Sequence, residues 1–181
     1  MSSVEEGIST GIIKLDGRLI IILDFEKIMS DINPETGLKM TDIEELGERG
    51  RYDVPILIAE DSPLLNKLIV DSLHKAGYVN LIRTENGQQA YDVVMDCKEE
   101  GTLDEHIKCI ITDIEMPIMD GHRLTKLIKE DDATKHIPVV IFSSLVNEEM
   151  KRKGEALGAD AQLSKPEIGN LVRVVDKLVL K

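Results

Sequence analysis

The sequence predicts an α/β protein in which helices cover a five-stranded parallel sheet on both faces. Three observations support this fold. From residue 54 to residue 181, short apolar runs alternate with segments whose apolar residues recur at helical spacing. Helix start and stop signals separate these segments, and polar residues follow several of the apolar runs. Such an alternation is typical of parallel sheets with a helix between successive strands.

Five short runs carry the strand signal, because they are rich in Ile, Leu and Val and are bounded by polar or turn residues. They comprise residues 55–59, 81–83, 107–112, 138–142 and 161–163. The first run is followed by Ser62-Pro63, an N-cap and a residue suited to the first helical position. The helix that starts there is expected to close at Gly77.

Four further helices are predicted from their start signals and apolar stripes. One opens at Gly87, the next carries Leu124, and a third runs from the cap Asn147 to Gly158. The last helix, residues 168–179, has Ile, Leu and Val on one stripe.

The N-terminal part of the chain predicts a different structure, a β-hairpin. Residues 11–15 and 18–23 are β-branched runs on either side of Asp16-Gly17. Asp-Gly between two such runs is a strong signal for a two-residue hairpin turn.

A linker is expected between the hairpin and the α/β part. Asp24 can cap a short helix over residues 25–32, and Thr41 with Glu44 can form a capping box in the polar stretch that follows. The predicted division is residues 1–32, a linker over 33–53, and the α/β domain over 54–181.

Composition bounds the class of protein. The chain has 181 residues, 42% of them apolar, and a formal net charge of −12, which disfavours nucleic acid because phosphate binding needs clustered Lys and Arg. The longest apolar run, residues 19–23, is too short to cross a membrane, and the polar start does not resemble a signal peptide. We therefore expect a cytoplasmic protein without membrane insertion.

The cysteines and histidines suggest no site. Cys97 and Cys109 lie in apolar patterns and are expected to be buried free thiols. The histidines show no ligand spacing, so surface or hydrogen-bonded roles are expected; they are His74, His106, His122 and His136.

Polar residues follow four of the predicted strands, and parallel strands deliver such residues to one edge of the sheet. They are Glu60, Asp61, Asp113, Ser143 and Lys165. Three clustered carboxylates repel one another unless a cation neutralises them, and Mg²⁺ prefers such oxygen ligands. A carboxylate flanked by Mg²⁺, an ammonium and a hydroxyl is suited to attack phosphorus.

Four segments resemble the motifs of the response-regulator receiver family, in its order and spacing. They are Ile56-Leu-Ile-Ala-Glu-Asp-Ser62, Asp113-Ile-Glu-Met-Pro-Ile-Met-Asp-Gly121, Pro138-Val-Val-Ile-Phe-Ser143 and Ser164-Lys-Pro166. The resemblance covers residues 54–181 and implies the flavodoxin-like, CheY-like fold. It also implies a phospho-acceptor rather than an enzyme.

By this resemblance Asp113 accepts the phosphoryl group from a histidine kinase. Asp61 and Asp113 would bind Mg²⁺ directly, Glu115 would offer its backbone carbonyl, and Glu60 would act through water. The resemblance makes Ser143 the switch hydroxyl and Lys165 the phosphoryl contact, with a cis peptide after Lys165.

Three positions depart from the family pattern. Glu60 stands where Asp is usual, although its longer side chain should still reach a metal-bound water. Glu115 replaces a neutral residue and adds negative charge beside the acceptor. Gln162 stands where an aromatic residue usually couples to the switch hydroxyl, so the usual aromatic rotamer switch is not expected.

The hairpin segment resembles the C-terminal part of a CheW-type coupling domain, on the residues from Gly11 to Ile28. A coupling segment followed by a receiver is the order of CheV-type chemotaxis proteins. This resemblance implies a CheA-type kinase and chemoreceptors as partners. It also implies a fragment, because a whole coupling domain needs more strands. The apolar hairpin is expected to pair with a second copy of the chain.

Two other functions remain open from the sequence. The receiver could be an inactive scaffold, although the acceptor residues are all present. Asp113-Ile-Glu115 also superficially fits the Asp-x-Asp motif of aspartate-nucleophile phosphatases. That motif normally ends in Asp and follows the first strand, whereas Asp113 follows the third.

Overall fold

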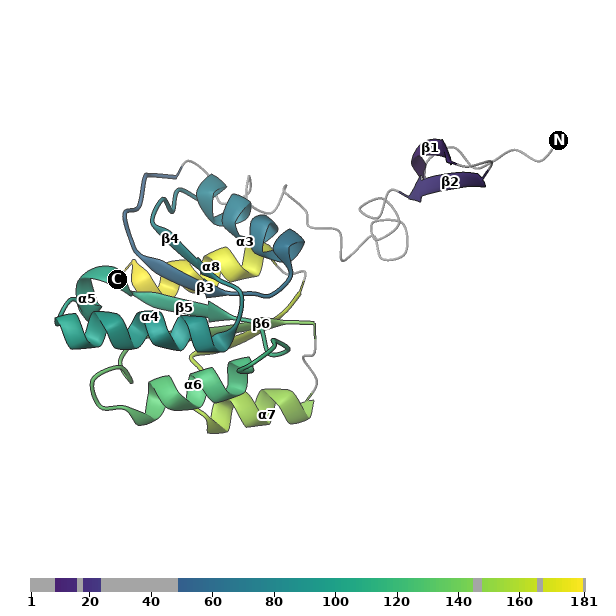
Figure 1. The fold of residues 1–181 in the computed structure, drawn as a ribbon. Helices are drawn as coiled ribbons and strands as arrows, with labels where there is room; N and C mark the ends of the chain where they lie inside the picture. The colour runs from purple at the N-terminus through teal and green to yellow at the C-terminus, as the bar shows by residue number, and fades with distance from the viewer. Residues whose placement is uncertain (1–8, 16–17, 24–48, 145–147, 166–167, 181) are drawn as a thin grey trace. The chain divides into compact units, whose positions relative to one another are not determined.

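The computed structural model describes residues 9–15, 18–23, 49–144, 148–165 and 168–180 (Figure 1). The chain divides into two compact units, Met1–Leu38 and Lys39–Lys181. Several expectations lie outside the described residues: the Asp16-Gly17 turn, the helix over 25–32, the Thr41–Glu44 capping box, the Asn147 cap and the peptide bond after Lys165.

The first unit contains the two expected strands. β1 (Ser9–Leu15) and β2 (Arg18–Leu23) pair in antiparallel register, with Leu15 opposite Arg18. This pairing leaves two residues for the connection, as a tight hairpin requires. β1 begins two residues before the run that the sequence indicated.

The second unit confirms the five-stranded parallel sheet. Its strands are β3 (Ile56–Ala59), β4 (Leu81–Thr84), β5 (Cys109–Thr112), β6 (Val139–Ser143) and β7 (Ala161–Ser164). Their order is β4-β3-β5-β6-β7, and every neighbouring pair is parallel. β3, β5 and β6 are buried along their whole length, which explains their continuous apolar sequences.

The expected helices are also present in the second unit. They are α3 (Pro63–Lys75), α4 (Gly87–Glu100), α6 (Gly121–Glu130), α7 (Glu148–Ala156) and α8 (Ile168–Val179). Side chains that accept hydrogen bonds from backbone amides cap three of them: Ser62, Asn86 and Asp120. The sequence reading missed the one-turn helix α5 (Leu103–His106), which is too short to show a helical period.

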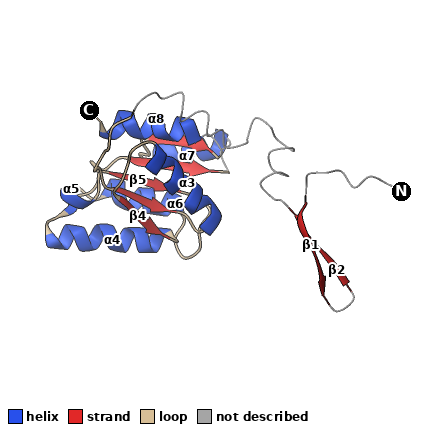
Figure 2. Ribbon diagram, turned by 90° about the horizontal axis from the view of Figure 1, so that it is seen from above, coloured by secondary structure: helices blue, strands red, loops and turns tan. Residues whose placement is uncertain are grey.

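Helices pack on both sides of the sheet, with α8 on one side and α4 on the other (Figure 2). α3 contacts α8, whereas α4 contacts both α5 and α6. The core beneath α4 and α6 is almost entirely aliphatic and includes Leu57, Val94, Ile110, Leu124 and Ile128. On the opposite face of the sheet, Ile69, Leu73, Leu171, Val172 and Val175 are buried.

Two expectations about single residues are wrong. His122 was expected at the surface or hydrogen-bonded. It is 3% exposed, and its Nε2 has no hydrogen-bond partner among the described residues. Cys109 is buried as expected, but Cys97 is partly exposed; both are free thiols.

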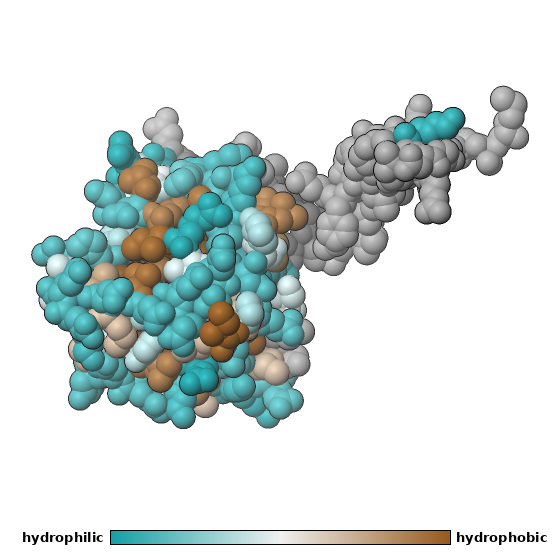
Figure 3. Space-filling view, viewed as in Figure 1, coloured by the Kyte–Doolittle hydropathy of each residue, from teal (hydrophilic) through white to brown (hydrophobic). Residues whose placement is uncertain are grey.

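The surface of the second unit is mainly hydrophilic on the face shown in Figure 3, with apolar side chains in small groups. Among the described helices, none has the length and apolar character needed to span a membrane. Four large apolar side chains of the described part are exposed: Leu64, Val79, Ile118 and Leu180.

Candidate phosphoryl-acceptor site

The sheet places the polar residues of two adjacent strands side by side. Glu60 and Asp61 directly follow β3, Asp113 directly follows β5, and these strands are hydrogen-bonded neighbours. From β3 the chain goes to β4 on one side of it, and then crosses back to β5 on the other side. In open parallel sheets, ligands bind where the strand order reverses in this way.

Three carboxylates meet at this point. Glu60, Asp61 and Asp113 each offer one oxygen, and these oxygens lie within 4.8 Å of one another. Glu60 and Asp113 are buried, at 2% and 8% exposure, whereas Asp61 is exposed. Charges this close, and partly out of water, strongly favour a bound cation.

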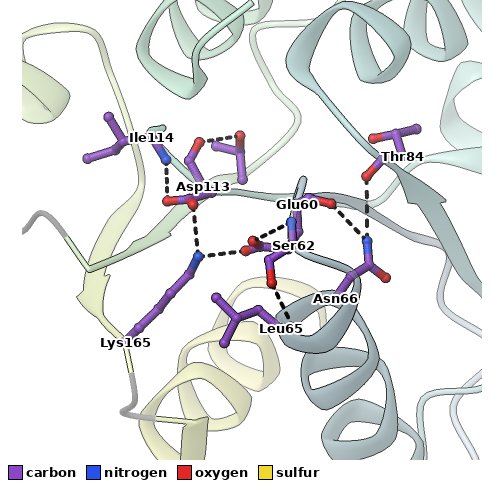
Figure 4. Close-up of polar contacts among 9 residues, drawn as sticks. Glu60, Ser62, Leu65, Asn66, Thr84, Asp113, Ile114 and Lys165 are labelled. Carbon is purple, nitrogen blue, oxygen red and sulfur yellow. Dashed lines mark hydrogen bonds and ion pairs between the residues drawn. The ribbon is translucent and has the colours of Figure 1, made fainter. Parts of the chain in front are cut away.

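Lys165 supplies one positive charge to the group. Its Nζ lies 2.6 Å from Glu60 Oε2 and 2.8 Å from Asp113 Oδ2, and its side chain is only 7% exposed (Figure 4). Three carboxylates and one ammonium leave two formal negative charges in the cluster. That remainder matches the charge of one divalent ion.

The Asp113 carboxylate is held in a fixed orientation. Its Oδ1 accepts a hydrogen bond from the backbone N–H of Ile114 at 2.6 Å, while its Oδ2 faces Lys165. The Asp113 backbone N–H donates to the carbonyl of Ala59 at 3.0 Å, which ties the ends of β5 and β3 together. Asp113 is therefore presented with little freedom to rotate.

Gly121 allows the chain to pass close to Asp113. A Cβ at this position would lie 1.8 Å from the Asp113 carbonyl oxygen, which no side chain can tolerate. The Gly121 N–H donates to the carbonyl of Ile114 at 3.0 Å, and α6 begins at Gly121. The loop after β5 is thus closed tightly against Asp113.

Glu60 has the most perturbed carboxyl in the site. Burial raises the pKa of Glu60 above its ordinary value, and this effect exceeds the lowering by the Lys165 ammonium. Its Oε1 accepts from the backbone N–H of Ser62 at 3.2 Å. Burial therefore disfavours the ionised form of Glu60, and the ion pair with Lys165 opposes this effect.

Asn66 supports the site, and the sequence reading missed it. This buried residue of α3 donates from Nδ2 to the carbonyls of Glu60 at 3.2 Å and Thr84 at 3.5 Å. Its Oδ1 accepts from Arg83 Nε at 2.6 Å. An amide side chain among the apolar positions of a predicted helix was the signal that could have identified it.

Of the other residues expected at the site, Ser143 lies at the end of a strand, whereas the side chain of Glu115 lies outside the carboxylate group. Ser143 is buried at the end of β6, and its carbonyl accepts from the backbone N–H of Lys165 at 3.0 Å. The side chain of Glu115 is exposed and lies outside the carboxylate group. Its role through the backbone carbonyl stays a prediction.

Gln162, which stands at the aromatic position, binds to α7. Its Nε2 donates to the carbonyl of Lys151 at 2.6 Å, and its Oε1 is buried with no partner in the described structure. The side chain lies against Gly154, where a Cβ would be 2.5 Å from the amide carbon. An amide therefore fills the space between β7 and α7.

The sequence of this chain is similar to those of several known proteins. The family model of the response regulator receiver domain matches residues 56–176. A gliding motility regulatory protein of Myxococcus xanthus is 33% identical over 165 residues, which are 90% of this chain and 19% of that protein. Chemotaxis protein CheV2 of Helicobacter pylori is 30% identical over 178 residues, 96% of this chain and 54% of CheV2. The chain thus spans about half of CheV2 and much less of the Myxococcus protein.

Solved structures show the same fold. One of them, the Mn²⁺-bound form of response regulator Rcp1, superimposes with a TM-score of 0.58 at 23% identity. The match covers 71% of this chain and 95% of Rcp1.

Proposed function

The chain belongs to the response-regulator receiver family, and from this premise we propose that Asp113 accepts a phosphoryl group from a histidine kinase. The observation that carries the proposal is the position of Lys165. Its ammonium lies within 2.8 Å of the acceptor carboxylate, inside a cluster of three carboxylates. A structural ion pair would need neither the additional exposed carboxylate of Asp61 nor the fixed orientation of Asp113.

Asp113 is the nucleophile in this proposal. One of its carboxylate oxygens attacks phosphorus, a new P–O bond forms, and the bond from phosphorus to the donor imidazole nitrogen breaks with its electron pair going to that nitrogen. The Ile114 N–H orients the carboxylate, and Lys165 balances negative charge on the phosphoryl oxygens. Ser143 would donate its hydroxyl to the same group.

Glu60, Asp61 and Asp113 fit a resident Mg²⁺, because their oxygens converge within 4.8 Å and carry surplus negative charge. Asp61 and Asp113 would hold the ion directly, Glu60 through water, and the Glu115 carbonyl would complete the set. When bound, the ion neutralises charge on the transferring phosphoryl group. The Mn²⁺-bound form of Rcp1 supports a divalent ion in this fold.

The partners proposed for this receiver are those of chemotaxis. The similarity to CheV2 extends over both the hairpin and the receiver, which supports a CheA-type kinase as donor and chemoreceptors as partners of the coupling segment. In this role the receiver would modulate the coupling of receptor to kinase. The hairpin is proposed to pair with a second copy.

A small phosphodonor tests the proposal. The intact protein is incubated with Mg²⁺ and acetyl phosphate, and its mass is followed together with release of inorganic phosphate. One added phosphoryl group, labile to hydroxylamine and absent in Asp113→Asn, is expected. An unchanged mass without release of phosphate would identify an inactive scaffold, and rapid release of phosphate over many turnovers without accumulation of the acyl phosphate would identify a phosphatase.

A further inference from the structure

A cluster of side chains holds residues 49–53 against the receiver; it consists of Arg49, Tyr52, Tyr78 and Asp176 and is called the Arg49 clasp below. Arg49 and Asp176 form a two-pronged ion pair, Nη1 to Oδ2 at 2.9 Å and Nη2 to Oδ1 at 2.6 Å. Arg49 Nε donates to the carbonyl of Ala76 at 2.6 Å. Such paired geometry is stronger and more directional than an ordinary surface ion pair.

Aromatic and backbone contacts complete the clasp. The Tyr52 ring lies 5.5 Å from Arg49 Cζ and 5.3 Å from the ring of Tyr78. The Tyr78 hydroxyl donates to Asp176 Oδ1 at 2.6 Å, and burial together with this carboxylate raises the pKa of Tyr78. Tyr52 N–H donates to the Gly77 carbonyl at 2.8 Å, and its carbonyl accepts from Val79 N–H at 3.1 Å.

Gly77 allows residues 49–53 to approach the receiver closely. Its φ of +94° suits glycine, and a Cβ there would lie only 2.0 Å from the carbonyl oxygen of Gly50. The receiver therefore provides a complementary surface on which residues 49–53 dock. A simple tether needs neither the ion pair nor this close approach.

The clasp and the acceptor lie at opposite ends of the strands but share α8. Tyr52 and Tyr78 precede β3 and β4, whereas Glu60 and Asp113 follow β3 and β5. Lys165 is three residues before α8, and Asp176 lies near the end of that helix. Ile168, Leu171, Val172 and Val175 are buried along α8, so the helix is one closely packed element that can transmit strain along its length.

We propose that residues 49–53 are a docking segment whose hold on the receiver weakens when Asp113 is phosphorylated, which rests on the proposed acceptor function. A phosphoryl group extends the acceptor and draws Lys165 away from its present position between Asp113 and Glu60. α8 follows Lys165 and carries Asp176 with it. The clasp is complete with unmodified Asp113, so displacement of Asp176 lengthens its hydrogen bonds.

Hydrogen exchange on the full chain tests the proposal. The backbone amides of Tyr52 and Val79 report the docking directly, and beryllium fluoride with Mg²⁺ serves as the phosphoryl mimic. We expect both amides to exchange about fivefold faster or more with the mimic than with Mg²⁺ alone, the lower range of typical coupling between sites.

Reciprocity gives a second measurement. If the mimic weakens the clasp, then breaking the clasp must tighten binding of the mimic by the same factor. Arg49→Gln removes the charge, whereas the milder Arg49→Lys keeps the charge but loses the two-pronged ion pair with Asp176. Both variants should therefore bind beryllium fluoride more tightly than wild type does. Arg173→Gln, an exposed Arg on the same helix, makes the same charge change outside the clasp and should bind like wild type.

The outcomes separate the two proposals. Binding of the mimic with unchanged exchange at Tyr52 and Val79, and unchanged affinity in both Arg49 variants, would make the clasp purely structural and overturn the inference. Slower exchange at these amides would contradict the stated direction. If the mimic does not bind to wild type, the acceptor function itself fails.

Discussion

Lys165 is the shared counterion of Glu60 and Asp113, and all three side chains are at least nine-tenths buried. Replacement by Met keeps the volume but leaves two buried carboxylates without their counterion. We expect Lys165→Met to lose about 3–5 kcal/mol of unfolding free energy without Mg²⁺, as is typical when one partner of a buried ion pair is removed. Urea denaturation measures the loss.

Magnesium provides the control for this variant. Because a bound divalent ion neutralises the same carboxylates, Mg²⁺ should stabilise Lys165→Met more than wild type. Lys135→Met removes an exposed ion pair with Asp132 and should respond to Mg²⁺ as wild type does. An equal response of Lys165→Met and wild type would place the ion away from Lys165.

Ile118 stores strain in the loop that follows Asp113. Its φ is 68° and its side chain is 77% exposed, so a β-branched residue occupies the left-handed region without burial to offset it. We expect Ile118→Asn to raise the unfolding free energy by about 1 kcal/mol, because the left-handed conformation costs ordinary residues roughly 1–2 kcal/mol and Asn tolerates it better.

Chemical denaturation tests this expectation. Val79→Asn is the control, because it also replaces an exposed β-branched residue by Asn, but at a position without positive φ. It should not raise the unfolding free energy. A gain in both variants, or in neither, would show that the strain at Ile118 is not what limits stability.

His122 should make stability depend on pH. Burial, and then the charge of Lys153, lower the pKa of His122 below 6.5. The unfolded chain therefore binds more protons than the folded protein as the pH falls through this range. Stability from the neutral imidazole is present above pH 6.5 and is lost as the pH falls toward the folded pKa.

The comparison with His122→Gln isolates this effect. Thermal melts in the absence of Mg²⁺ between pH 7.5 and pH 5 should show a steeper loss for wild type than for His122→Gln. His74→Gln, at an exposed position of α3, serves as the control and should follow wild type. Parallel curves for wild type and His122→Gln would contradict the effect of burial on this imidazole.

At the level of helices and strands, α7 packs against β7 where the Gln162 side chain lies against Gly154. Ala normally stabilises a helix interior by about 1 kcal/mol relative to Gly. Here a Cβ would meet the Gln162 amide at 2.5–2.7 Å, so we expect Gly154→Ala to lose about 1 kcal/mol instead, a typical cost of overpacking.

A double-mutant cycle tests this match. In a Gln162→Ala background the amide is gone, and Gly154→Ala should then stabilise the protein. Urea denaturation of the four proteins gives the coupling energy. Additive effects of the two substitutions would show that the amide moves aside freely and does not fix α7.

The regular elements could be predicted because local signals agree with their environment. β3 and β5 are buried on both faces, so their runs are wholly apolar, and Ser62-Pro63 both caps and starts α3. α5 left no signal, because four residues cannot show a helical period. The Arg49–Asp176 pair was also missed, since its partners are 127 residues apart and no local pattern links them.

In the candidate site, the residues at the strand ends could be predicted from the sequence, but the contacts made by helix packing could not. Strand ends alone brought Glu60, Asp61 and Asp113 to one edge, because parallel strands all end there. Sequence could not give the burial of His122 or the contact of Gln162 with Lys151, because both depend on how helices pack on the sheet.

At the scale of the whole molecule, the hairpin is expected to drive association. The sequences of β1 and β2 are rich in Ile and Leu, at Ile12, Ile13, Leu19, Ile20, Ile21, Ile22 and Leu23. A lone two-stranded hairpin is marginal in water, and burial of one such side chain contributes about 1.5–3 kcal/mol. Light scattering should show dimers for the whole chain in the micromolar range.

A chain that starts at Lys39 is the matched control. It keeps the second unit, including the Arg49 clasp, and lacks the hairpin. It should be monomeric at the same concentrations. Monomers in both cases, or equal dimers in both, would exclude the hairpin as the dimerisation element.

Different parts of the molecule meet the two ends of β3. The strand has four residues, so its ends are about 13 Å apart at roughly 3.3 Å per residue. If Asp113 accepts a phosphoryl group as proposed, the donor must arrive at the edge that carries Asp113, whereas residues 49–53 enter the domain at the other edge. Residues 49–53 therefore leave the route to Asp113 open, and a donor can approach without first displacing them.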